Sequence, residues 1–71
     1  MKLPRNVSGA AASRALQRLG FTVTRQIGSH ARLARGERRV TVPMHSTLAP
    51  GTLQSILRQG DVSLEVFLEV L

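Results

Sequence analysis

A histidine at position 30, directly after Gly28 and Ser29, is the residue of this chain best suited to acid–base chemistry. An imidazole titrates in the neutral pH range, and a positioned one accelerates a reaction by about 10²–10⁴-fold. It can remove the proton of a ribose 2′-hydroxyl, which then attacks the adjacent phosphate and leaves a cyclic phosphate and a free 5′-hydroxyl. This chemistry requires RNA, because DNA lacks that hydroxyl. The alternative is that His30 is an ordinary solvated surface residue.

The charge of the chain favours a phosphate-rich partner. Ten Lys and Arg residues against four Asp and Glu give these 71 residues a net charge of +6 and a pI near 11.9. Nine of the ten basic residues are Arg, whose planar guanidinium matches the oxygens of a phosphate. A genome biased toward Arg codons would give the same composition, so the preference for Arg is weak support. The net charge itself predicts polyanion binding.

Basic side chains near His30 provide the phosphate-binding groups in this interpretation. Alternate residues of a strand point to the same side, so His30 and Arg32, with Arg39 on the next strand, should project from one open sheet face. Arg32 or Arg39 would then stabilise the added negative charge of the transition state. The residues expected to bind RNA are Lys2, Arg25, Gly28, Ser29, Arg32, Arg39 and Thr52.

Backbone groups contribute to this expected set at two places. Gly28 permits a tight turn and close approach to a phosphate, while Ser29 offers its hydroxyl and amide. The start of a later helix near Thr52 offers N–H groups to phosphate. The alternative for Gly28 and Ser29 is an ordinary connection between strands.

His45 is the second imidazole, in the loop that follows the third expected strand. It is either the complementary acid for the leaving oxygen or an idle loop residue. The two histidines and the four scattered carboxylates show no metal-ligand spacing. Metal-assisted hydrolysis is therefore disfavoured, and no metal or cofactor is expected.

The periodicity predicts a helix, three strands and two further helices. Ser8 caps the first helix and Gly20 ends it. The two-residue period then predicts strands at 21–27, 30–35 and 38–42, with Pro43 ending the last. A second helix opens at Pro50 and ends at Gly60, and Ser63 caps a last short one. In the first strand Phe21, Val23 and Ile27 alternate with Thr22, Thr24 and Gln26, but Arg25 breaks the inward set, so the end of this strand is expected to be exposed. The residues of the other two strands expected to point inward are Ala31, Leu33, Val40 and Val42.

These elements define an α+β fold within one domain of residues 1–71. The strands form an antiparallel meander whose one face is covered by the helices, leaving the other face wet. The layout, helix, three-stranded antiparallel sheet, helix and short helix, resembles the double-stranded-RNA-binding-domain fold. On the last helix, Val66 and Val70 lie off the main apolar stripe, either at the edge of a partner surface or as scattered exposed valines.

The chain has no cysteine, no apolar segment typical of a signal peptide and no uncharged stretch free of Pro and Gly that is long enough to span a bilayer. Disulfide staples are thereby excluded. We expect a soluble cytoplasmic protein without membrane association.

Several short segments, in their order and spacing, resemble the HicA family of mRNA interferase toxins over nearly the whole chain. They are Val7-Ser8-Gly9, Leu19-Gly20-Phe21, Arg25 with Gly28-Ser29-His30, Val40-Thr41-Val42-Pro43, and Pro50-Gly51-Thr52-Leu53 through Ile56-Leu57. The resemblance implies a double-stranded-RNA-binding-like fold and a ribonuclease that arrests translation, as the toxin of a type II toxin–antitoxin system with a role in stress response. It implies a cognate HicB antitoxin that covers the active surface. It also implies that His30 is catalytic, and it carries no role onto His45. One departure is Ala10-Ala11-Ala12, where larger and charged residues are usual.

The combined prediction is a metal-independent endoribonuclease that cleaves mRNA, with His30 as general acid or base. One alternative is a non-catalytic RNA-binding module of the same fold. Another is an interaction protein whose basic face binds an acidic partner. A homodimer is possible, although no residue pattern supports it.

Overall fold

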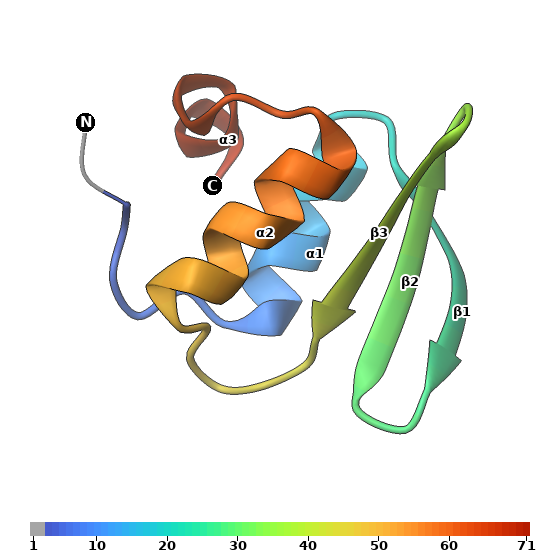
Figure 1. The fold of residues 1–71 in the computed structure, drawn as a ribbon, viewed down its shortest axis with the longest axis horizontal. Coiled ribbons are helices and arrows are strands. Elements are labelled where there is room, and N and C mark those ends of the chain that lie inside the picture. Colours follow the sequence, from blue (N-terminus) through green and yellow to red (C-terminus); the bar gives the residue numbers. More distant parts are fainter. Residues whose placement is uncertain (1–2) are drawn as a thin grey trace.

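The structure, a computed structural model, describes residues 3–71 and has the predicted order of helix, three strands and two helices (Figure 1). The elements are α1 (Gly9–Arg18), β1 (Thr22–Ile27), β2 (His30–Arg35), β3 (Arg38–Pro43), α2 (Pro50–Gly60) and α3 (Leu64–Val70). This order confirms the predicted α+β class and the double-stranded-RNA-binding-like layout. Lys2, one of the expected RNA-binding residues, lies outside the described residues.

The three strands form an antiparallel sheet in the order β1-β2-β3, joined by two-residue turns. Gly28 and Gly36 come first in these turns, with φ angles of 58° and 59°, a conformation that strains any residue with a Cβ. A positive φ followed by a negative one is the pattern of a type II′ turn, whose twist suits a hairpin. The turns fix a register in which His30 pairs with Ile27 on β1 and with Pro43 on β3.

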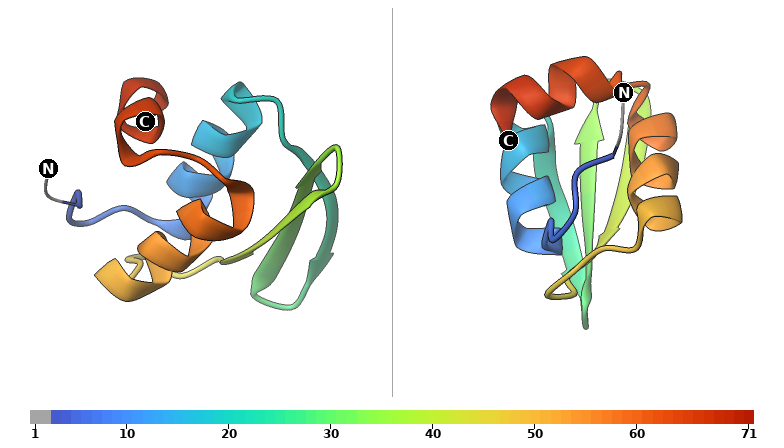
Figure 2. Two further views of the ribbon diagram at one scale, coloured as in Figure 1. Left: turned by 45° about the horizontal axis from the view of Figure 1, so that its top comes forward. Right: turned by 90° about the vertical axis from the view of Figure 1, so that its left-hand side faces the viewer.

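All three helices lie on one side of the sheet, where α1 and α2 run side by side and α3 crosses one end of the pair (Figure 2). Both α1 and α2 pack against β3, and α3 packs against α1. The other face of the sheet is uncovered, as predicted. The buried apolar residues are Val7, Ala12, Ala15, Leu16, Phe21, Ala31, Leu33, Val40, Val42, Leu48, Leu53, Ile56, Leu57, Val62 and Phe67.

The helix starts follow the predicted caps. The Ser8 hydroxyl accepts from the Ala11 amide at 3.0 Å, and the Ser63 hydroxyl accepts from the Val66 amide at 3.2 Å. Ala12 in the first turns of α1 is fully buried. Ala11, which is half-buried, also packs against the core.

The end of β1 is exposed, as predicted, and Val23 lies on the core-facing side without being covered by a helix. All six residues of β1 are exposed, Val23 by 38% and Ile27 by 47%. A bulge between Val23 and Arg25 shifts the register, so Val23 pairs with buried Leu33 while Ile27 pairs with His30. One extra residue reverses the face of every side chain beyond it, which puts Ile27 on the uncovered face. Because the helices pack against β3, neither residue of this edge strand is covered.

Helix α2 ends at Gly60, as predicted. The residue after it, Asp61, is the left-handed cap, with a φ of 54°. A Cβ at position 60 would come within 3.1 Å of the Phe21 ring and of Val40. A side chain at position 60 would require these two side chains to shift by a few tenths of an ångström, because α2 passes close to the sheet there.

Of the two valines considered for a partner surface on α3, only Val66 is exposed, by 42%. Val70 is half-buried and packs against the core. The Val70 carbonyl also accepts a hydrogen bond from Arg18 of α1 at 2.7 Å. Val70 therefore helps to hold α3 on α1.

Candidate nucleic-acid interface

The uncovered face of the sheet presents its side chains in rows that run across the strands. Directly paired residues of an antiparallel ladder share a face, with Cβ atoms about 4.5–5.5 Å apart. The histidine row contains Ile27, His30 and Pro43, the arginine row contains Arg25, Arg32 and Thr41, and the third row contains Thr22, Ala34 and Arg39. Neighbouring rows are two residues apart along a strand, which corresponds to about 7 Å. The predicted placement of His30, Arg32 and Arg39 on one open face is confirmed.

His30 is the first residue of β2, and its side chain is exposed. Within residues 3–71 its imidazole makes no hydrogen bond, so both ring nitrogens are open to a ligand. Its direct ladder partners, Ile27 and Pro43, carry no charge. The nearest cations on this face belong to the arginine row.

Backbone hydrogen bonds connect the turn before His30 with the segment after β3, and that segment with the start of α1. The Ser29 carbonyl accepts from the Met44 amide at 2.6 Å, and the His45 carbonyl accepts from the Gly9 amide at 2.9 Å. A Cβ at position 9 would collide with the Pro43 carbonyl oxygen and lie 2.8 Å from the Met44 Cα. Gly9 therefore lets α1 begin directly against the end of β3, beside the turn that precedes His30.

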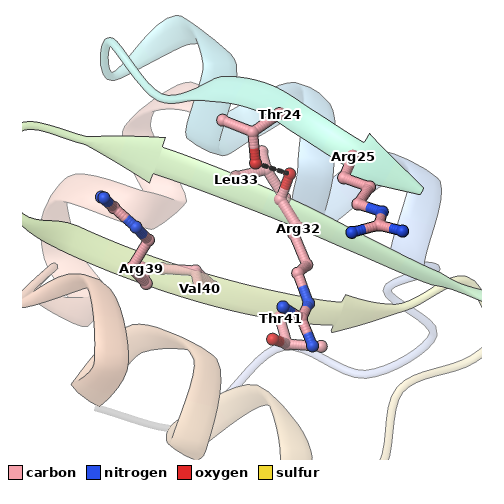
Figure 3. A pocket seen from close by; sticks show the side chains of 7 residues that line it. All are labelled: Thr24, Arg25, Arg32, Leu33, Arg39, Val40 and Thr41. Atoms are coloured by element: carbon pink, nitrogen blue, oxygen red, sulfur yellow. Dashed lines mark hydrogen bonds between the residues drawn. The ribbon is translucent and has the colours of Figure 1, made fainter. Parts of the chain in front are cut away.

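The arginine row borders a hollow of about 310 Å³ on the uncovered face. The lining residues are Thr24, Arg25, Arg32, Leu33, Arg39, Val40 and Thr41. Figure 3 shows the Arg32 side chain extending from β2 toward Thr41 on β3, with Arg25 on the neighbouring strand. His30 does not line the hollow and lies one row away from its two central arginines.

Arg25 and Arg32 differ from Arg39 in what their guanidinium groups contact. Neither Arg25 nor Arg32 has a hydrogen bond or an ion pair from its side chain within residues 3–71. The Nη1 of Arg39 donates to the Gly36 carbonyl at 3.0 Å, and the side chain points away from the other two (Figure 3). Two unpaired guanidinium groups from directly paired strand positions form an anion-binding surface.

Of the other residues expected in the site, Gly28, Ser29 and His45 lie toward the His30 end of the sheet, whereas Thr52 does not. Gly28 and Ser29 form the exposed turn next to His30. His45 is exposed two residues beyond Pro43, the ladder partner of His30, so both imidazoles lie toward the same end of the sheet. Thr52 is half-buried in the first turn of α2, in the helix layer, and is not part of the uncovered face.

Sequence reasoning did not assign a binding role to Thr24 or Thr41, which both line the hollow. The Thr24 hydroxyl donates to the Arg32 carbonyl at 3.2 Å. The Thr41 amide, at the outer edge of β3, donates to the Gln59 side chain of α2 at 3.0 Å. The outward position that strand alternation predicts for both threonines was the available signal, whereas Arg25 comes to this face through the bulge.

Residues 3–71 contain neither a metal-binding cluster nor a membrane-spanning helix. No three His, Asp or Glu side chains of this part of the chain lie together as a metal-binding group. Nor does any of its helices have the length and apolar character required to cross a bilayer.

The family model described as HicA toxin of bacterial toxin–antitoxin matches residues 11–62. The chain belongs to the HicA toxin family. The matched stretch runs from α1 to just beyond α2 and includes all three rows of the uncovered face. As a HicA toxin, the chain has a cognate antitoxin as its expected partner. No curated protein matched the chain in a sequence comparison.

Proposed function

We propose that this HicA toxin is a metal-independent endoribonuclease that cleaves mRNA in the cytoplasm, with His30 as general acid or base. The observation that carries the proposal is the placement of His30, exposed and unbonded, one row from the unpaired arginines 25 and 32 on the same face. A chain of net charge +6 attracts RNA, and the His30 imidazole lies on an uncovered surface that bound RNA can reach.

RNA binding in this proposal depends on the backbone of the nucleic acid. Phe21 and Phe67 are both buried in the core, at 3% and 0% exposure, so neither aromatic ring offers a stacking surface for bases. Guanidinium groups on a flat sheet contact phosphate oxygens, which position the strand without selecting its sequence. Arg25 and Arg32 therefore supply the main phosphate contacts.

The chemical step is a transesterification within the RNA. His30 accepts the proton of a 2′-hydroxyl, and the 2′-oxygen forms a bond to phosphorus while the bond from phosphorus to the 5′-oxygen breaks. The leaving 5′-oxygen takes up a proton, from water or from an imidazolium, for which His45 is the second candidate. The products are a 2′,3′-cyclic phosphate and a 5′-hydroxyl. The positive field of the arginine row, one row away from His30, favours the more negative transition state.

A HicB-type antitoxin would neutralise this activity by covering the uncovered face. That face exposes His30 and the arginine row together, so one bound protein blocks both groups. Acidic side chains on the antitoxin would complement the arginines.

A non-catalytic RNA-binding module is the second candidate. The hollow that concentrates the arginines does not include His30 in its lining. In this candidate the RNA backbone occupies the hollow, and the imidazole is an accessory surface group.

Cleavage of a defined RNA in excess EDTA tests the proposal. We expect products that end in a 2′,3′-cyclic phosphate and a 5′-hydroxyl. A matched RNA with one 2′-deoxynucleotide at the cleavage site should bind equally and stay intact at that site. Cleavage of the deoxy-substituted RNA at the same position would exclude transesterification. Binding without any cleavage would favour the non-catalytic module.

A further inference from the structure

The uncovered face separates the group suited to proton transfer from the groups suited to phosphate binding. The histidine row contains His30 between two uncharged neighbours, Ile27 and Pro43. The cations of the arginine row, Arg25 and Arg32, lie about 7 Å farther along the strands. An RNA whose reacting nucleotide is at His30 must therefore place another part of its backbone over the arginine row.

The arginine row carries an uncompensated charge. Arg25 and Arg32 are direct ladder partners, and like charges in this position destabilise a sheet. The described part of the chain contains an ion pair between Arg38 and Asp61, at 3.4 Å, but no carboxylate within ion-pair distance of Arg25 or Arg32. A bound anion would remove this repulsion.

The hollow beside the arginine row has the donors that a phosphodiester requires. The hollow of about 310 Å³ lies on the uncovered face and is lined by residues of all three strands, among them Arg25 and Arg32, whose guanidinium groups are unbonded in the described part of the chain. The Thr41 hydroxyl also makes no hydrogen bond within residues 3–71 and can donate to a phosphate oxygen. The Thr24 hydroxyl is already engaged with the Arg32 carbonyl at 3.2 Å.

We propose that this hollow is a subsite for a non-scissile phosphodiester, the neighbour of the one that is cleaved at His30. The inference rests on the proposed ribonuclease function. Neighbouring phosphates along an extended RNA strand are separated by a distance comparable to the spacing of the two rows. The hollow then fixes the register of the strand, so that a 2′-hydroxyl comes to the imidazole. The smallest substrate that uses both rows contains two consecutive phosphodiesters.

Neutralising single phosphates of the RNA tests this subsite. An RNA with a mapped cleavage site carries one 2′-deoxynucleotide there, which blocks the reaction and permits equilibrium binding. Uncharged methylphosphonates then replace one phosphate at a time on both sides of that site. We expect the wild-type protein to lose about tenfold in affinity at one of the two phosphates next to the scissile one.

The arginine row is varied in the same series. In the double variant Arg25→Ala, Arg32→Ala the same methylphosphonate should change affinity less than about twofold, because its partners are absent. The matched control Arg14→Ala, Arg58→Ala removes two exposed arginines from α1 and α2. It should keep the wild-type response to the methylphosphonate, and thermal melting verifies that both variants fold.

The outcomes separate the subsite from the function on which it rests. The subsite is overturned if only substitution of the scissile phosphate lowers affinity, or if the arginine double variant responds to the methylphosphonates as the wild type does. In either case, cleavage of unmodified RNA by the wild type still upholds the ribonuclease. If the wild type does not cleave the unmodified RNA in EDTA, both proposals fall.

Discussion

Arg25 and Arg32 face each other directly across the ladder between β1 and β2, and both side chains lie on the uncovered face of the sheet (Figure 3). Two positively charged side chains at directly paired positions, without a carboxylate partner, lower the stability of the folded chain. A surface of this kind is stabilised by an anionic ligand, because the ligand binds only the folded state.

Removing one of the two charges should therefore stabilise the protein and weaken RNA binding. We expect Arg25→Thr to raise the free energy of unfolding by a few tenths to about 1 kcal/mol at low salt. The gain should largely disappear near 1 M salt, where the Debye length is about 3 Å. Urea denaturation at both salt concentrations measures this effect, with Arg14→Ala as the control for loss of one charge. A gain of equal size at high salt would assign it to β-propensity and would contradict the repulsion.

Arg32 and Arg39 should contribute differently to RNA binding, because only the Arg39 guanidinium is held by a hydrogen bond within residues 3–71. Arg39 donates to the Gly36 carbonyl at 3.0 Å, whereas Arg32 has no such contact among the described residues. We expect Arg32→Ala to weaken RNA binding several-fold more than Arg39→Ala. Titration of a fluorescent RNA against each variant at one salt concentration measures the difference. Equal losses of RNA affinity in the two variants would contradict the prediction and would show that the hydrogen bond to the Gly36 carbonyl does not withhold Arg39 from RNA.

Gly9 should be one of the least replaceable residues of the chain. A Cβ at this position collides with the Pro43 carbonyl, so Gly9→Ala must displace α1 or the end of β3. We expect a loss of about 1–3 kcal/mol in the free energy of unfolding. Gly51→Ala is the matched control, since nothing lies within 4 Å of its Cβ, and it should not destabilise the protein. Chemical denaturation of both variants decides the matter, and equal stability of the two would contradict the close packing at Gly9.

The two hairpin glycines provide a comparison between stability and activity. Gly28 and Gly36 have φ angles of 58° and 59° and open space around them, so alanine should cost about 1–2 kcal/mol at either position. Only Gly28 belongs to the turn that leads into His30. Gly28→Ala should therefore also reduce the cleavage rate of the folded protein, while Gly36→Ala should leave that rate unchanged. The cleavage rate of each variant, divided by its folded fraction, measures the difference, and an equal reduction in the two variants would contradict the prediction.

The sequence predicted the elements and the face of β2 and β3 because local signals determined them. Ala31 and Leu33 alternate with His30 and Arg32, and this two-residue period survives in the structure. The caps at Ser8 and Ser63 likewise depend on neighbouring residues alone.

The remaining features depend on pairing and packing between distant residues. The bulge in β1 carries no local residue signal. Arg25 indicated that the end of the strand is exposed, but not that Ile27 pairs with His30 on the uncovered face. The close passage of Gly60 by Phe21 and Val40 arises from the tertiary arrangement of α2 on the sheet. The orientation of Arg39 toward the hairpin depends on a carbonyl that the turn exposes.

Single-turnover cleavage by His30→Ala tests the central claim most directly. With protein saturating over RNA and EDTA in excess, we expect the rate of the variant to fall by about 10²-fold or more. Its RNA affinity and melting temperature should stay near those of the wild type, because the side chain is exposed and unbonded. Thr22→Ala, in the third row of the same face, should keep the wild-type rate. Cleavage by His30→Ala at the wild-type rate would contradict the account.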